Sequence, residues 1–87
     1  MKQFTYTITD ALGIHARPAG MLAKLAKSYG PDTTATLTKG DKTVKLSQLM
    51  MLMGLAVKQG QEVTVTVDGP AEEDACAALQ AFFQENL

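Results

Sequence analysis

Two segments of this chain alternate strictly between apolar and polar residues, and the alternation limits the folds that 87 residues can adopt. In residues 3–9 and again in residues 62–68, every second side chain is apolar, which predicts strands with one face on a core and one in water. A weaker version covers residues 34–38, and a turn at residues 39–41 leads to a return strand over residues 43–46. The side chains expected to face the core are Phe4, Tyr6, Ile8, Ala35, Leu37, Val63, Val65 and Val67.

Three other segments have the spacing of helices. Residues 18–29 and 71–82 each carry an apolar stripe, and Pro70 suits the first position of the second of these helices. Residues 47–53 predict a short helix that stops near Gly54. The apolar stripes contain Pro18, Met21, Leu22, Leu25, Ala26 and Tyr29 in the first long helix, and Ala71, Ala75, Ala78, Leu79 and Phe82 in the last.

The order of these elements is βαββαβα, which predicts an α+β fold. One-sided strands are typical of an antiparallel sheet, so we expect an open-faced sandwich of four strands with three helices on one face. Residues 1–87 contain no interdomain linker or repeat, and we expect them to form a single domain.

The composition excludes several classes of function. Eight basic and nine acidic residues give a net charge of −1, which argues against nucleic-acid binding. Uninterrupted apolar runs such as residues 49–53 are far shorter than the ~20 residues of a membrane-spanning helix. One cysteine and one histidine give no internal disulfide and no metal site. With no signal-peptide pattern at the N-terminus, we expect a cytoplasmic monomer that does not insert into membranes.

The only histidine, His15, lies immediately before the expected start of a helix. A lone histidine is most often an ordinary surface residue, but here Gly13 permits a tight turn and Pro18 places the helix start beside the imidazole. The first N–H groups of a helix have no intrahelical partner and carry partial positive charge. With Arg17 alongside, the position favours a histidine that becomes negatively charged by accepting a phosphoryl group. The helix start over Ala16, Arg17 and Pro18 is then the predicted phosphate contact.

The stretch Gly13-Ile14-His15-Ala16-Arg17-Pro18-Ala19 resembles the active-site motif of HPr, the histidine-containing phosphocarrier family of the bacterial sugar phosphotransferase system. The resemblance continues through residues 52–57, Gly60, residues 62–65 and residues 68–69, and covers essentially the whole chain. It implies that His15 receives phosphate at Nδ1 from enzyme I, which is charged by phosphoenolpyruvate, and passes it to IIA domains of sugar permeases. It also implies that Arg17 assists, that no cofactor is needed, and that the protein is a stoichiometric carrier rather than an enzyme.

The methionine-rich segment 49–53 has two interpretations, a core helix or a surface that engages partners. A short helix on a sheet cannot bury five apolar side chains, so some must face solvent. The resemblance implies that this helix and the first one form the docking face for enzyme I and the IIA domains. Lys24 is either part of that face or a solvated helix flank. The expected docking residues are Ala16, Gly20, Met21, Lys24, Leu49, Met51 and Leu52.

Ser47 also has two interpretations. In many Gram-positive relatives an ATP-dependent HPr kinase phosphorylates a serine at the start of the short helix, and counting back from Gly60 places Gln48 in that slot. Ser47 is then expected to cap the short helix, its hydroxyl accepting a hydrogen bond from a first-turn N–H, rather than to be a regulatory phosphosite. An HPr-like regulatory docking protein, acting in catabolite or nitrogen-branch control, is the alternative function. Cys76 is expected to be a small packing residue.

Overall fold

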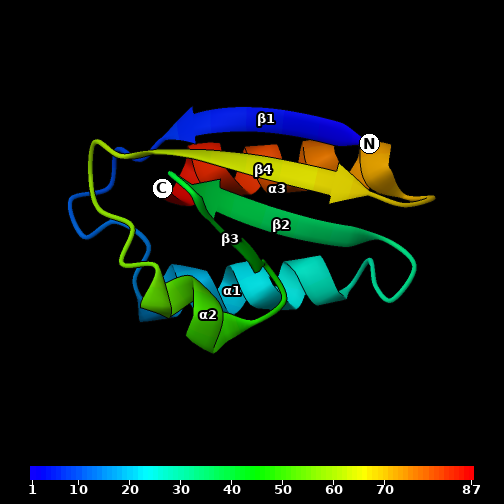
Figure 1. Cartoon of the computed structure of the whole chain (residues 1–87), viewed down its shortest axis with the longest axis horizontal. Helices are drawn as coiled ribbons and strands as arrows, with labels where there is room; N and C mark the ends of the chain where they lie inside the picture. Colours follow the sequence, from blue (N-terminus) through cyan, green and yellow to red (C-terminus); the bar gives the residue numbers. More distant parts are fainter.

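The computed structural model describes residues 1–87 and has the element order βαββαβα (Figure 1). This order and the α+β class confirm the sequence-based prediction. None of the three helices combines the length and hydropathy that a bilayer crossing requires. The elements are β1 Lys2–Thr7, α1 Ala16–Lys27, β2 Thr34–Lys39, β3 Lys42–Lys45, α2 Leu49–Gly54, β4 Glu62–Asp68 and α3 Glu72–Asn86.

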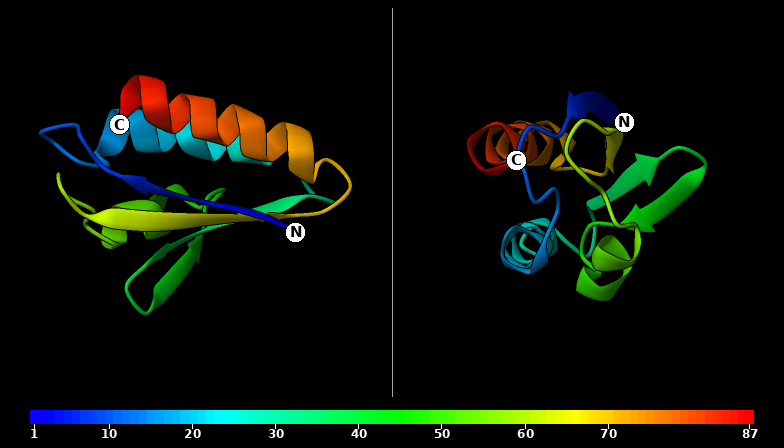
Figure 2. Two further views of the ribbon diagram at one scale, coloured as in Figure 1. Left: turned by 90° about the horizontal axis from the view of Figure 1, so that it is seen from above. Right: turned by 90° about the vertical axis from the view of Figure 1, so that its left-hand side faces the viewer.

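The four strands form one antiparallel sheet in the order β1-β4-β2-β3. At its centre Val65 pairs with Phe4 of β1 on one side and with Leu37 of β2 on the other. Helices α1 and α3 lie side by side over one face, and α2 packs against α1 and β3 at the end of the sheet (Figure 2). Strand β3 begins one residue earlier than expected, because Lys39 already pairs with Lys42 across the turn.

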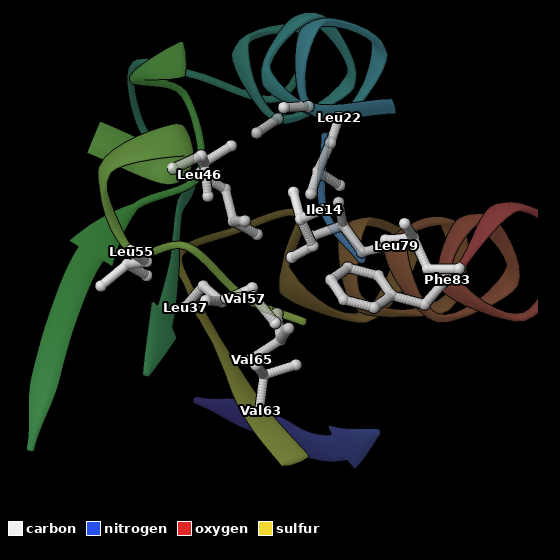
Figure 3. Close-up of a cluster of buried hydrophobic side chains, with 14 of the residues drawn as sticks. Ile14, Leu22, Leu37, Leu46, Leu55, Val57, Val63, Val65, Leu79 and Phe83 are labelled. Carbon is white, nitrogen blue, oxygen red and sulfur yellow. The ribbon is translucent and has the colours of Figure 1, made fainter. Parts of the chain in front are cut away.

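The core lies between the sheet and the two long helices (Figure 3). The three valines of β4 are at most 1% exposed, as their alternation predicts. In α3 the fully buried aromatic residue is Phe83, whereas Phe82, which the expected stripe contains, is only partly buried and packs against the core. The rings of Phe4 and Tyr6 on β1 contact the Phe83 ring edge to face, with centroid distances of 5.7 and 5.6 Å. These contacts favour burial of Phe83.

Helix α3 begins later than its sequence suggests. Pro70 was expected at the first helical position, but the N-cap is Ala71 and the helix starts at Glu72. A buried side chain from another loop fixes this start: Thr33 Oγ1 accepts a hydrogen bond of 3.0 Å from the Ala71 N–H. The acidic first turn is present as predicted, and the Met1 ammonium lies 2.6 Å from Glu72 Oε2. This contact holds the pKa of Glu72 below its usual value of 4.5.

The apolar stripe of α1 differs from the expected one at Met21. The buried side chains are those of Pro18, Ala19, Leu22, Ala23 and Ala26, whereas Met21 is 49% exposed. Because successive residues of a helix are about 100° apart, Met21 lies on the flank of the stripe that Leu22 and Ala26 form.

Candidate functional site

His15 is the N-cap residue of α1. Its backbone is extended, with φ −110° and ψ −179°, and its carbonyl accepts the first intrahelical hydrogen bond from the Ala19 N–H at 2.9 Å. The N–H groups of Ala16 and Arg17 have no acceptor within the protein, and Pro18 has no N–H to satisfy. Two unpaired backbone donors therefore stand directly beside the imidazole, as the sequence predicts.

The backbone before His15 is held against the segment that follows α2. Gly13 has φ +67°, and a Cβ built on it would lie 2.1 Å from the Val57 oxygen and 2.8 Å from the Lys58 Cα. The next residue, Ile14, is 5% exposed, and its N–H donates to the Val57 oxygen at 3.0 Å. Only a glycine permits this approach, so the tight turn inferred from the sequence is also a close contact.

The earlier part of the same loop is held by the C-terminal residue and by the segment that follows α2. The N–H groups of Thr9 and Asp10 donate to the Leu87 oxygen at 2.6 and 2.8 Å. The Gln59 side chain donates to the Thr9 oxygen at 3.0 Å. Within the loop, Asp10 Oδ1 accepts from the Leu12 N–H at 2.8 Å. The histidine therefore stands on a rigid support rather than on a mobile loop.

The charge around His15 is positive and unpaired. Arg17 is exposed and forms no ion pair with any carboxylate, and the first turn of α1 carries no acidic residue. The guanidinium can therefore bind an incoming anion without first breaking a salt bridge. The imidazole is partly buried, so one side remains accessible to a reaction partner. The arrangement suits a nucleophile that receives a phosphoryl group and holds it at a helix N-terminus.

Most of the residues expected to dock partners are exposed. Met21 and Leu49 are 49% and 38% exposed, Met51 is 51% exposed, and Ala16 and Lys24 also face solvent. Gly20 is partly buried. The inclusion of Leu52 is wrong, because this side chain is fully buried and anchors α2 to the core. A six-residue helix with one anchor leaves its other apolar side chains on the surface.

The start of α2 differs from expectation, whereas the helix stops at Gly54, as expected. Its N-cap is Gln48, with φ −108° and ψ 96°, so the prediction that Ser47 caps the helix is wrong. Ser47 instead lies in the turn closed by the hydrogen bond from the Gln48 N–H to the Lys45 oxygen, one residue too early to reach the first-turn donors. At the other end, Gly54 is still helical and the left-handed residue is Ala56, with φ +52°.

Several residues that support the site carried no sequence signal. Lys39 Nζ donates to the Leu55 oxygen at 2.9 Å and to the Ala56 oxygen at 3.4 Å, which fixes the chain just before Val57. Val57 and Gln59 act through a carbonyl and a side-chain amide that no spacing rule singles out. Only the three-dimensional pairing with the 9–14 loop reveals them.

Comparison with known proteins gives concordant results. The sequence profile described as "PTS HPr component phosphorylation site" matches residues 2–85. The phosphocarrier protein HPr of Mycoplasma capricolum subsp. capricolum is 39% identical over 84 residues, covering 97% of this chain and 89% of the relative. The solved structure of a mycoplasma histidine-containing phosphocarrier protein superimposes with a TM-score of 0.91 at 33% identity, covering 97% of this chain and 93% of that one.

A solved structure with a different role is also similar. The Bacillus subtilis catabolite repression protein Crh has a TM-score of 0.76 at 33% identity, with 100% of this chain and 98% of that chain covered. That protein is described as a domain-swapped dimer, so the monomeric state expected for this chain stays a prediction.

Proposed function

This chain belongs to the HPr family of phosphocarrier proteins, and from this premise we propose that His15 accepts a phosphoryl group from enzyme I and passes it to IIA domains of sugar permeases. The observation that carries the proposal is the place of His15 as the N-cap of α1, beside two free backbone donors and an unpaired arginine. The protein is then a stoichiometric carrier, phosphorylated and dephosphorylated once in each cycle.

In the loading step, His15 Nδ1 attacks the phosphorus carried by phosphorylated enzyme I. A bond forms from phosphorus to Nδ1 as the bond from phosphorus to enzyme I breaks, and enzyme I retains that electron pair. The Ala16 and Arg17 N–H groups and the Arg17 guanidinium stabilise the charge on the transferring oxygens. The unloading step reverses this attack, with a group of the IIA domain as the nucleophile.

The rigid support of the loop contributes by keeping Nδ1 in place. Phosphoryl transfer depends on in-line approach, and a displacement of about 1 Å can cost about 10²-fold in rate. The contacts of the loop with Val57, Gln59 and Leu87 limit such displacement.

Intact mass after incubation with enzyme I and phosphoenolpyruvate tests the proposal. We expect one added phosphate that is labile in acid and stable in base, as a phosphoramidate is. His15→Ala abolishes the adduct while the thermal midpoint stays close to wild type, because the His15 side chain forms no hydrogen bond within the protein. A His15→Ala variant that still gains phosphate from enzyme I would rule out His15 as the acceptor.

We further propose that Met21, Lys24, Leu49 and Met51 contact enzyme I and the IIA domains, together with Ala16 and Gly20. Their exposure and the packing of α1 against α2 support one continuous face. Met51→Glu places a charge in an apolar contact and is expected to raise the Kd for enzyme I at least about tenfold, or about 1.4 kcal/mol. Unchanged calorimetric affinity in a folded variant would remove Met51 from the interface.

Regulatory docking is the second candidate, favoured by the similarity to the catabolite repression protein. Gln48 at the N-cap of α2 opposes control by an ATP-dependent HPr kinase, because an amide cannot accept the phosphoryl group. We expect no labelling of wild type by such a kinase and clear labelling of Gln48→Ser. Efficient labelling of wild type that disappears in Ser47→Ala would instead make Ser47 a regulatory site.

A further inference from the structure

All five methionines of this chain are exposed, and three of them lie on α2. The exposed fractions are 79% for Met50, 51% for Met51 and 41% for Met53, whereas Leu52 between them is fully buried. Leu52 is the only fully buried residue of α2, so packing of the core does not require the three methionines. These side chains are therefore open to small reagents in solvent.

An exposed thioether reacts with peroxides. The sulfur lone pair attacks one peroxide oxygen, an S–O bond forms as the O–O bond breaks, and the second oxygen leaves as water after protonation. Sulfur loses two electrons and hydrogen peroxide is reduced to water. Thiol-dependent methionine sulfoxide reductases reverse the change, oxidising two thiols to a disulfide and releasing water. The only sulfur outside the five methionines is that of Cys76, a partly buried residue of α3 that packs against the core.

We propose that Met50, Met51 and Met53 form a reversible oxidation site, at which peroxide converts the apolar surface of α2 into a polar one and weakens partner docking. The inference rests on the docking face of the proposed function. Sulfoxide oxygens must lose their water when a partner covers them, and an apolar partner surface offers no replacement hydrogen bond. Met50 and Met51 also line a hollow of about 370 Å³ with Val44 and Leu55, so oxidation alters that recess as well.

The oxidation acts on the surface and leaves the fold in place. None of the three side chains belongs to the buried core, and Leu52 still anchors α2. The regulated quantity is therefore the affinity for partners, and the thermal midpoint of the oxidised protein stays close to that of the reduced protein.

The test compares two proteins in a Cys76→Ala background, one with the native α2 and one with Met50→Leu, Met51→Leu and Met53→Leu. Leucine keeps the surface apolar and cannot be oxidised by peroxide. Each protein is treated with hydrogen peroxide, its oxidised residues are mapped by mass spectrometry, and its Kd for enzyme I is compared with that of its own untreated form. Both proteins retain Met1 and Met21, which control for oxidation elsewhere.

We expect peroxide to raise the Kd of the protein with native α2 at least about tenfold more than that of the triple variant, a difference of about 1.4 kcal/mol. Methionine sulfoxide reductases restore the affinity, and Met51→Gln, which resembles the sulfoxide, reproduces part of the loss without peroxide. The inference would be overturned if peroxide weakened the affinity of the two proteins for enzyme I equally, or if it weakened neither. If the untreated protein accepts no phosphate from enzyme I, the proposed function is rejected. Mass-spectrometric mapping of oxidised Met50, Met51 and Met53 and their repair by the reductases would still test the oxidation site.

Discussion

Replacing Gly13 with alanine tests whether the contact beneath the His15 loop supports both stability and transfer. Gly13 has φ +67°, where a Cβ costs about 1–2 kcal/mol in any environment. The new methyl would also lie 2.1 Å from the Val57 oxygen, so the loop must move away and the Ile14 N–H loses its acceptor. Leaving those buried groups unpaired costs about a further 1–3 kcal/mol. We therefore expect Gly13→Ala to lose about 2–5 kcal/mol in all.

Gly40 supplies a matched control. Its φ is +62°, almost the same angle, but nothing lies within 4 Å of the position a Cβ would take. Gly40→Ala should therefore lose only the backbone contribution of about 1–2 kcal/mol. In urea unfolding, the midpoint of Gly13→Ala should lie at least about 1 M below that of Gly40→Ala, for a denaturant slope of about 1 kcal/mol per M.

Phosphoryl transfer provides the second measurement on the same pair. Under conditions where both variants are folded, Gly13→Ala should accept phosphate from enzyme I about 10²-fold more slowly than wild type, because Nδ1 of His15 is displaced. Gly40→Ala should transfer at the wild-type rate, since its turn lies outside the site. Equal stability losses in the two variants, or a wild-type transfer rate in Gly13→Ala, would refute the reasoning.

The remaining predictions concern four separate residues. Arg17→Lys keeps the charge but loses the planar fork of donors, so stopped-flow transfer should slow by about 10²-fold while the urea midpoint stays near wild type. Thr33→Val removes the acceptor for the N–H at the start of α3 and should lower the free energy of unfolding in urea by about 1–3 kcal/mol. Thr33→Ser keeps the hydroxyl and should stay close to wild-type stability. Ala56→Gly relieves a φ of +52° on an exposed residue and should raise the free energy of unfolding by about 0.5–1 kcal/mol; a loss in chemical denaturation would contradict this. The N-terminal ammonium lowers the pKa of Glu72, so their contact stabilises the fold fully above pH 4.5. This stabilisation is lost as the pH falls through the folded-state pKa. The difference in unfolding free energy between wild type and Glu72→Gln should therefore shrink in acid.

The sheet and the position of His15 could be predicted because each depends on local chemistry. Val63, Val65 and Val67 alternate with threonines, and a period of two has one structural interpretation. His15 lies between a glycine and a proline that mark a turn and a helix start within a few residues. In both cases the determining neighbours are adjacent in sequence, so no distant contact was needed to interpret them.

The wrong predictions concern helices in which neighbouring residues are both apolar. There a contact with a distant part of the chain decides which of the two side chains is buried. Every residue from Leu49 to Met53 is apolar, so no periodicity identifies Leu52 as the anchor of α2. Phe82 and Phe83 both continue an apolar stripe of α3, and the rings of β1 decide between them. The Val57 carbonyl that holds the loop belongs to the backbone, which is the same chemical group in every residue.

The hydrogen bonds from Thr9 to Leu87 join residues 78 positions apart, so the loop before His15 is anchored by a residue that is synthesised much later. The His15 segment leaves the ribosome early, but the carbonyl that anchors its loop is made only after α3 has been translated. A nascent chain therefore contains His15 before its loop is anchored to Leu87. Under the proposed function, phosphate acceptance at His15 would therefore require the end of α3 to be in place.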